Sequence, residues 1–266
     1  MNLKLTGLHV LITGGSKGIG LACALGFLQE GARVTLVSRS PSNLANGVAQ
    51  LQKDMPKSMG QIGTVTADLR DAAQAADALA EAEQLHGDVD VLVNSAGAAR
   101  RTPPDELNAL AWHDAMDAKF FTYIHMMDLV VKKMALRGHG SIVNVIGAGG
   151  KVASPIHLPG GAANAALMLV SAGLAAAYGP RGVRVNAVNP GATITDRLVE
   201  GLQTAARLDN ISIDEAMRRA SKNVPLGRLA LPEEIANMVL FLASDCASYV
   251  TGAIVSMDGA ATPMVV

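Results

Sequence analysis

The sequence predicts an α/β fold in which a doubly wound, seven-stranded and mostly parallel sheet carries helices on both faces. Two observations lead to this prediction: strand-length apolar runs alternate with helical segments, and a glycine-rich turn joins the first strand to the first helix. Half of the 266 residues are hydrophobic and the net charge is −1, which is typical of a soluble domain with a large core. We find no repeat or change in composition that would divide residues 1–266, so we predict one domain.

Short segments rich in Val, Ile and Leu predict the strands, and they alternate with segments rich in helix formers. Gly31 is placed to end the first helix, and Pro232 is placed to begin the last one. The predicted strands are Leu8–Ile12, Arg33–Val37, Ile62–Thr66, Val89–Val93, Ser141–Ile146, Val183–Val188 and Ile254–Met257. The predicted helices are Ile19–Glu30, Asn43–Asp54, Ala72–Leu85, Leu107–Leu136, Gly161–Tyr178 and Pro232–Ala243.

Residues 192–224 are polar and helical only in patches, and they lie between the sixth strand and the last long helix. We expect this segment to form a substrate lid. Only 17% of the residues are charged and no cluster of Lys or Arg stands out, so nucleic acid is not an expected partner.

Other classes of protein are also disfavoured. Apolar runs such as Met238–Ala243 are much shorter than the roughly 20 residues that span a bilayer, so we expect no membrane segment. The N-terminus lacks the pattern of a secretory signal, which favours a cytoplasmic location. Cys23 and Cys246 are expected to be buried in the core, and no spacing of Cys and His predicts a metal site.

The turn after the first strand has the sequence TGGSKGIG at residues 13–20 and opens a helix. Glycines let backbone N–H groups approach a pyrophosphate, and the helix N-terminus adds partial positive charge at that anion. Glycines alone would be compatible with an ordinary turn, but strand, turn and helix stand in the order that a nucleotide site requires. We therefore predict dinucleotide binding here.

The end of the second strand indicates which dinucleotide is bound. An acidic residue there would accept hydrogen bonds from the free ribose 2′-hydroxyl of NAD, but this chain has Ser38 and Arg39. Arg39, together with Lys17 in the glycine-rich turn, offers cations for a 2′-phosphate. Either residue taken singly is equally compatible with a solvated surface charge. Because both surround one predicted pocket, they favour NADP(H).

The glycine spacing resembles that of the short-chain dehydrogenase/reductase family, whose pattern Thr-Gly-x-x-x-Gly-x-Gly is matched at residues 13–20. Further matches are Asp68-Leu69, the tetrapeptide at residues 94–97, Asn189-Pro190-Gly191 and Val255–Gly259, so the resemblance covers almost the whole chain. It implies a Rossmann-type fold and an oxidoreductase.

The resemblance also implies roles for single residues. Asp68 would contact the adenine ring, Asn94 would tie strands together beside the ribose, and Thr193 and Thr195 would hold the nicotinamide amide. From the motifs and the resemblance together, the expected cofactor-binding residues are Gly14, Ser16, Lys17, Gly18, Ile19, Gly20, Ser38, Arg39, Asp68, Leu69, Asn94, Ala96, Gly97, Pro190, Gly191, Thr193 and Thr195.

The catalytic positions depart from the family pattern. Typical members carry a Ser after the fifth strand, Tyr-x-x-x-Lys at the next helix and an Asn on the preceding long helix, and the Tyr acts as general acid or base. Alignment places Gly147 at the Ser position and Gly160 at the Tyr position. Asn164 stands at the Lys position and Lys119 at the Asn position, so Lys and Asn have exchanged helices.

Lys119 lies at helical spacing with Trp112, Met116, Tyr123, Met127 and Val130, on a stripe that we expect to face the core. An unpaired ammonium in the core would be costly. We therefore expect Lys119 to point into the cofactor site, close to Asn164, and to supply the cation that relatives supply from the other helix. The alternative is that its side chain extends past the stripe to solvent.

A proton donor is still needed, and His157, on the loop that leads into the next helix, is the nearest titratable candidate. Many loop histidines are only solvated, and Tyr123 and Ser95 are weaker alternatives. The two glycines would also leave room for a bulky substrate. Arg100 and Arg101 would then bind an acidic group, or they are ordinary surface cations.

These observations leave three hypotheses. The first is an NADP(H)-dependent oxidoreductase in which Lys119, His157 and Asn164 replace the usual catalytic residues on a small-molecule substrate. The second is a catalytically silent NADP(H)-binding protein that acts as a sensor or partner subunit. The third is hydride transfer to an alkene with water as the acid. Relatives commonly form dimers or tetramers, and the small residues of Gly160–Ala177 suit such an interface.

Overall fold

The sheet of the computed structural model contains seven strands in the order β3-β2-β1-β4-β5-β6-β7, and every neighbouring pair is parallel. The structure describes residues 1–97 and 99–264. The strand order reverses between β1 and β4, where an α/β sheet opens a crevice at the carboxyl ends of its strands. The strands are β1 His9–Thr13, β2 Arg33–Ser38, β3 Ile62–Thr66, β4 Val91–Asn94, β5 Gly140–Val145, β6 Val183–Pro190 and β7 Ile254–Met257. The predicted sheet is confirmed.

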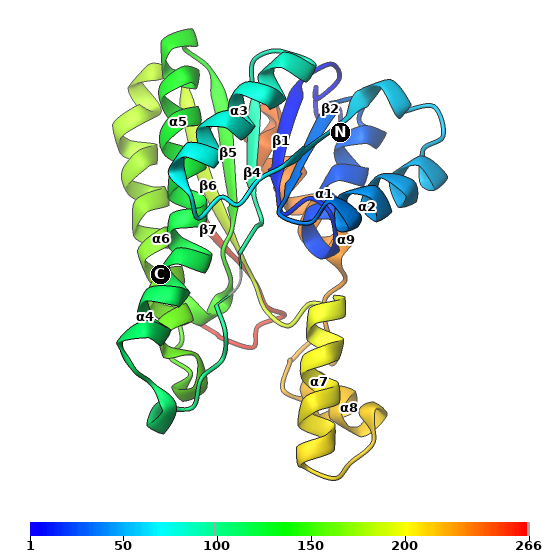
Figure 1. Ribbon diagram of the computed structural model, residues 1–266, viewed down its shortest axis with the longest axis vertical. Helices are drawn as coiled ribbons and strands as arrows, with labels where there is room; N and C mark the ends of the chain where they lie inside the picture. Colours follow the sequence, from blue (N-terminus) through cyan, green and yellow to red (C-terminus); the bar gives the residue numbers. More distant parts are fainter. Residues whose placement is uncertain (98, 265–266) are drawn as a thin grey trace.

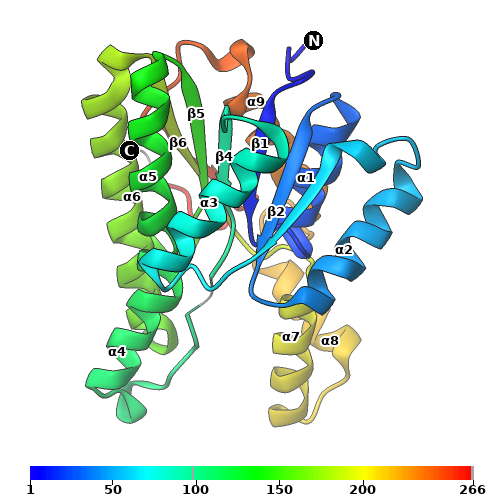
Figure 2. The ribbon, with the colours of Figure 1, turned by 45° about the horizontal axis from the view of Figure 1, so that its top comes forward.

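Helices cover both faces of the sheet, as Figures 1 and 2 show. Helices α1, α2 and α9 pack on one face around Phe27 and Val239, and α3, α5 and α6 pack on the other around Tyr123 and Leu167. The α-helices are α1 Gly18–Gln29, α2 Pro41–Asp54, α3 Ala72–His86, α4 Ala109–Ala115, α5 Thr122–Arg137, α6 Leu158–Tyr178, α7 Asp196–Leu208, α8 Ile213–Lys222 and α9 Pro232–Ala243.

The predicted single helix Leu107–Leu136 is wrong in one respect, because a π-helical turn at Met116–Phe121 separates α4 from α5. Such a turn leaves backbone carbonyls without their usual partners. The hydroxyl of Thr122 donates to two of them, at 3.0 Å to Asp117 O and 3.3 Å to Ala118 O. Gly97 makes room for the turn, since a Cβ atom there would overlap the carbonyl oxygen of Ala118.

The π turn also corrects the predicted apolar stripe. Lys119, Tyr123, Met127 and Val130 face the core, but Trp112 is 41% exposed. The extra residue in the turn rotates α4 relative to α5, so a stripe drawn at constant helical spacing does not continue through it. A second correction concerns Cys246, which is exposed, whereas Cys23 is buried as expected.

Residues 192–224 fold as α7 and α8, which project from the body at the carboxyl ends of the strands (Figure 1). Helix α6 and its flanks, Pro155–Arg181, are long and apolar enough to cross a bilayer by length and composition alone, which the short apolar runs did not indicate. One face of α6 packs against β6 and α5. The opposite face exposes a stripe without charges: Ala162, Ala165, Leu169, Ala172, Gly173 and Ala176.

Candidate active site

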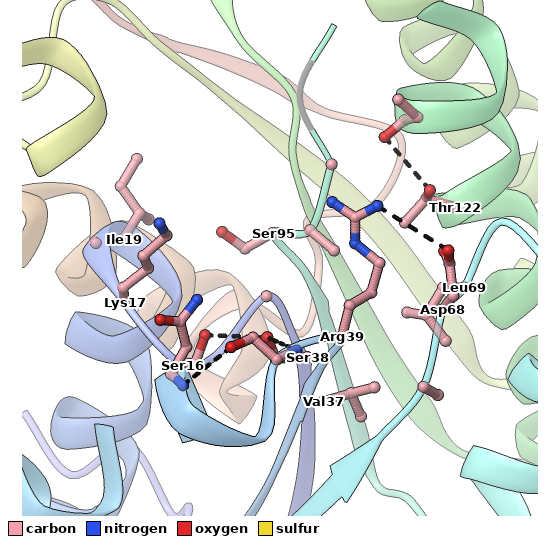
Figure 3. A pocket seen from close by; sticks show the side chains of 18 of the residues that line it. Ser16, Lys17, Ile19, Val37, Ser38, Arg39, Asp68, Leu69, Ser95 and Thr122 are labelled. Carbon is pink, nitrogen blue, oxygen red and sulfur yellow. Dashed lines mark hydrogen bonds and ion pairs between the residues drawn. The ribbon is translucent and has the colours of Figure 1, made fainter. Parts of the chain in front are cut away.

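A cavity of about 760 Å³ opens at the carboxyl ends of β1 to β4 (Figure 3). Twelve of the expected cofactor-binding residues line it: Gly14, Ser16, Lys17, Gly18, Ile19, Ser38, Arg39, Asp68, Leu69, Ala96, Gly97 and Thr195. The lining also contains residues that the motifs did not identify, among them Ser40, Asn43, Arg70, Ala118 and Thr122. The cavity therefore extends from the glycine-rich turn to the π turn.

The glycine-rich turn packs so closely that side chains would not fit. A Cβ atom on Gly14, whose φ is +68°, would lie 2.7 Å from the Cα atom of Ala96. A Cβ atom on Gly20 would overlap the carbonyl oxygen of Gly14. The backbone at the N-terminus of α1 is therefore exposed to the cavity, and this arrangement fits a pyrophosphate.

Asn94 stands behind the cavity wall and joins three strands. Its Oδ1 atom accepts a hydrogen bond from the Thr13 hydroxyl at 3.2 Å, and its Nδ2 atom donates to Asn144 Oδ1 at 3.0 Å. Asn144 in turn donates to Ser171 on α6 at 2.9 Å. All three strands, β1, β4 and β5, are thereby held in register beside the cavity. Gly20, Pro190, Gly191 and Thr193 also lie outside the lining residues.

Two arginines share one carboxylate at the cavity rim. The Arg70 Nε atom lies 3.0 Å from both carboxylate oxygens of Asp68, and an Arg39 Nη atom lies 4.0 Å from one of them (Figure 3). Arg70 and, less strongly, Arg39 hold the pKa of Asp68 below its usual value. Arg70 directly follows the Asp68-Leu69 match, so its position at the end of β3 was a usable signal. The rim thus carries two guanidinium groups and one carboxylate.

The hydroxyl groups of Ser16 and Ser38 line the same cavity and are 3.2 Å apart. Ser40 caps the N-terminus of α2 by accepting a hydrogen bond from the Asn43 backbone at 3.2 Å. Both arginines and both hydroxyls are groups that donate to phosphate oxygens. This rim fits the 2′-phosphate of NADP(H).

Lys119 is only 7% exposed, which excludes the alternative that it extends to solvent. Its Nζ atom donates to the Tyr123 hydroxyl at 2.8 Å and to the Val145 carbonyl at 3.2 Å. Its neighbours Ala118 and Thr122 line the cavity. Lys119 thus occupies the wall between the cavity and the end of β5.

His157 and Asn164 meet at the short turn Ala148–Gly150. A Cβ atom on Gly160 would overlap the His157 ring and lie 2.5 Å from its Nε2 atom. A Cβ atom on Gly147 would lie 3.4 Å from Asn164 Nδ2. The imidazole therefore occupies space beside Gly160, and the Asn164 amide lies beside Gly147.

The weaker candidates have different surroundings. Tyr123 is fully buried, and burial raises the pKa of its hydroxyl well above the usual value. Ser95 lines the cavity. Arg100 and Arg101 are exposed on a loop that is joined to the His157 loop by the 3.0 Å hydrogen bond from Thr102 N to Ile156 O. Among the described residues, no group of His, Cys, Asp and Glu is arranged to hold a metal ion.

Comparison with known proteins places this site in a family. A family model described as enoyl-(acyl carrier protein) reductase matches residues 14–262. The chain is 36% identical over 264 residues to D-threitol dehydrogenase of Mycolicibacterium smegmatis, covering 98% of this chain and 95% of that relative.

Solved structures agree. L-Sorbose reductase from Gluconobacter frateurii, complexed with NADPH and L-sorbose, has a TM-score of 0.93 at 26% identity, with both chains fully covered. An NADPH-bound short chain oxidoreductase from Pseudomonas aeruginosa PAO1, which contains an atypical catalytic center, has a TM-score of 0.88 at 27% identity over 98% of this chain and 99% of that one. The strand order, the glycine-rich turn and these matches show that this protein belongs to the short-chain dehydrogenase/reductase family.

Proposed function

We propose that this protein is an NADP(H)-dependent oxidoreductase that interconverts a carbonyl compound and an alcohol, or reduces an activated alkene, with His157 as the proton donor. The observation that carries the proposal is the place of the imidazole, which fills the space beside Gly160 where the family's Tyr side chain would begin. Imidazole has a pKa of about 6.5 when unperturbed and exchanges protons near neutral pH. His157 is thus a chemically suitable replacement for Tyr.

The choice of NADP(H) follows from the rim of the cavity. Arg39 and Arg70 line the same cavity as Ser16 and Ser38, and both arginines pair with Asp68 at its rim. The solved structures of L-sorbose reductase and of the P. aeruginosa oxidoreductase contain NADPH. When bound, this coenzyme supplies or accepts the hydride at its nicotinamide ring.

The remaining polar residues would act on the substrate oxygen. In the reducing direction, His157 gives a proton to the oxygen of the carbonyl as hydride reaches its carbon, and in the oxidising direction His157 accepts that proton. Asn164 Nδ2 lies beside Gly147, where the family's Ser would orient the oxygen, so we assign the orienting hydrogen bond to Asn164. Lys119, which lies in the π turn, would contribute the positive charge that the family's Lys supplies from the next helix.

The two glycines also bear on the substrate. The room that Gly147 and Gly160 were expected to leave for a bulky substrate is taken by the Asn164 amide and the His157 ring, so the two glycines do not by themselves widen the site. Arg100 and Arg101, on the loop tied to the His157 loop, favour an acidic group on that substrate. The lid would be α7 and α8, because Thr195 and Asp196 at the start of α7 line the cavity.

Oxidation of NADPH, followed at 340 nm with a panel of ketones, quinones and enoyl thioesters, tests this function. We expect turnover with at least one class and loss of about 100-fold or more in kcat on His157→Ala, the range for removal of a general acid. His139→Ala is the matched control, because His139 is an exposed histidine paired with Asp90 at the opposite end of the sheet. We expect it to leave turnover unchanged.

The alternatives give different results. Tight NADPH binding with no turnover across the panel would favour the catalytically silent binding protein. Turnover that survives His157→Ala but is lost in Lys119→Met would point to water as the acid. A cytoplasmic location stays a prediction.

We also propose a homo-oligomer built on α6. Its exposed stripe of Ala162, Ala165, Leu169, Ala172, Gly173 and Ala176 has no charged side chain, and small residues allow close helix packing. Leu169 is 77% exposed and Leu136 on the adjacent α5 is 88% exposed. Large apolar side chains at such exposure are typical of a surface that is covered in the assembly.

A further inference from the structure

The Tyr123 hydroxyl lies in a triangle with Lys119 Nζ and the Val145 carbonyl. Lys119 Nζ donates to Tyr123 Oη at 2.8 Å and to Val145 O at 3.2 Å, and the Tyr123 hydroxyl donates to the same carbonyl. The ammonium also lies 4.4 Å from the centre of the Tyr123 ring. Tyr123 and Val145 thus give this ammonium three contacts in the part of the chain that the structure describes.

The environment fixes the direction of these hydrogen bonds. Tyr123 is 0% exposed and Lys119 is 7% exposed, so water does not replace the contacts. Because burial raises the pKa of the Tyr123 hydroxyl, the hydroxyl keeps its proton at neutral pH. It donates this proton in a hydrogen bond to the Val145 carbonyl oxygen. Its lone pair is then directed to Lys119. The hydroxyl acts as an acceptor for the ammonium and does not act as an acid.

A lysine side chain needs such an anchor. It has four rotatable bonds, so holding it in one position costs conformational entropy. Lys119 also starts from a π turn, where helical spacing does not determine the direction of the side chain. Val145 is the last residue of β5 and comes two residues before Gly147, beside which the Asn164 amide lies. The anchor therefore sets the ammonium beside the proposed reaction centre.

We propose that Tyr123 is a positioning residue whose hydroxyl holds the Lys119 ammonium at the end of β5. This inference rests on the role proposed above for Lys119 in the active site. Tyr123 is completely buried and Lys119 is 7% exposed, so we assign Tyr123 no contact of its own with coenzyme or substrate. It acts through Lys119 alone.

A double-mutant cycle tests this dependence. Tyr123→Phe keeps the ring and removes only the hydroxyl. We expect it to lower kcat about tenfold, the effect of one hydrogen bond to a charged group, with KM for NADPH changed less than about twofold. In a Lys119→Met background, the same substitution should lower kcat less than about twofold. An equal loss in both backgrounds, or no loss in the wild type, would overturn the proposal.

The control variant is Tyr178→Phe, because Tyr178 on α6 is a partly buried tyrosine whose ring packs against Arg181. We expect it to leave kcat unchanged. Thermal unfolding of all variants identifies any loss of activity that comes from a damaged fold. If Tyr123→Phe lowers the melting temperature, and its effect on kcat simply adds to that of Lys119→Met, then Tyr123 has only a structural role.

A readout that needs no substrate separates this inference from the proposed function. In crystal structures of the wild type and of Tyr123→Phe, each soaked with NADPH, we expect Lys119 Nζ to leave the Val145 carbonyl only in the variant. An ammonium that stays in place would overturn the positioning role, whether or not turnover is found. If the ammonium moves in Tyr123→Phe but the wild type turns over no substrate on the panel, the proposed function would be contradicted. The positioning role of Tyr123 would still stand.

Discussion

At the level of single residues, the proposed function rests on side chains that would replace the family's Ser and Tyr from other positions. We align Gly147 and Gly160 with those two residues, and the space beside them is taken by the amide of Asn164 and the ring of His157. A side chain reaches such a place from a different backbone position when the intervening residues are small. Gly160 serves this purpose, because a Cβ atom there would lie 2.5 Å from His157 Nε2 and the ring would have to move.

Arg39 gives the first prediction at this scale. Its side chain is 65% exposed and pairs with Asp68 at 4.0 Å, a distance at which a 2′-phosphate would compete for the guanidinium. We expect Arg39→Gln to weaken NADPH binding about 10- to 100-fold, the value of a hydrogen bond to a charged group, and to leave NADH binding nearly unchanged. Isothermal titration calorimetry with both coenzymes measures this.

Lys53→Gln, at an exposed lysine in the last turn of α2, is the control and should change neither affinity. If Arg39→Gln weakened NADPH and NADH equally, Arg39 would support the shape of the rim and would not recognise the 2′-phosphate.

At the scale of the element, the π turn at Met116–Phe121 decides where Lys119 points. Its extra residue interrupts the helix, and the Thr122 hydroxyl takes up the carbonyl oxygens of Asp117 and Ala118. π turns are rare and occur often at functional sites. In this chain the turn faces Gly97 on one side and β5 on the other.

Thr122→Val therefore removes the hydroxyl at nearly constant shape. We expect it to lower the free energy of unfolding by about 1–3 kcal/mol, the cost of leaving buried polar groups without a partner. Turnover should fall as well, since Lys119 loses its support. Urea unfolding measures the first effect. Thr64→Val, at an exposed position of β3, should be neutral, and equal effects of the two substitutions would contradict this role of Thr122.

For the molecule as a whole, two histidines, His9 and His86, lie together at the end of the sheet opposite the cavity. His9 is fully buried, with Nδ1 at 2.7 Å from Gly87 O and Nε2 at 2.9 Å from the Thr35 hydroxyl. Burial lowers the pKa of His9, and burial also lowers that of His86, whose ring centre lies 5.4 Å away. The folded state therefore favours the neutral rings.

This gives a pH dependence with a definite sign. The unfolded chain, with histidine pKa values of about 6.5, takes up more protons than the folded chain as the pH falls below that value. The contribution of these two histidines to the free energy of unfolding is thus fully present above about pH 6.5 and decreases as the pH falls. We expect thermal unfolding scans to show a melting temperature that falls between about pH 7 and pH 5.

His9→Gln should be less stable at pH 7 but should show a smaller decrease over the same interval. His113→Gln, which changes an exposed histidine on α4, should keep the wild-type slope. A wild-type slope in His9→Gln would mean that other groups cause the acid sensitivity.

Assembly gives the last prediction at this scale. A carboxylate in the middle of the α6 stripe would be buried without a partner in any interface formed there, which is costly. We expect Leu169→Glu to reduce the molar mass measured by size-exclusion chromatography with light scattering, while NADPH binding persists. Met59→Glu changes an exposed apolar residue beside α2 and should leave the mass unchanged. A Leu169→Glu protein of wild-type mass would place the interface elsewhere.

Local sequence patterns alone predicted the sheet, the glycine-rich turn and twelve of the residues that line the cavity. These features depend on local patterns: alternating elements, glycines at positions that exclude side chains, and motifs at strand ends. Arg39 was also found in this way, because the end of β2 always lies at the carboxyl edge of the sheet.

Three features became visible only in the folded chain: the π turn, the contacts of buried Lys119 with Val145 and Tyr123, and the approach of the His157 ring to Gly160. Each depends on contacts between segments that helical spacing does not relate: Gly97 with the π turn, β5 with Lys119, and the His157 loop with the start of α6. A one-residue change in helical register rotates every side chain before it, as the exposure of Trp112 shows. Periodicity predicts a face only while the period is constant, and here the packing of distant segments changed it.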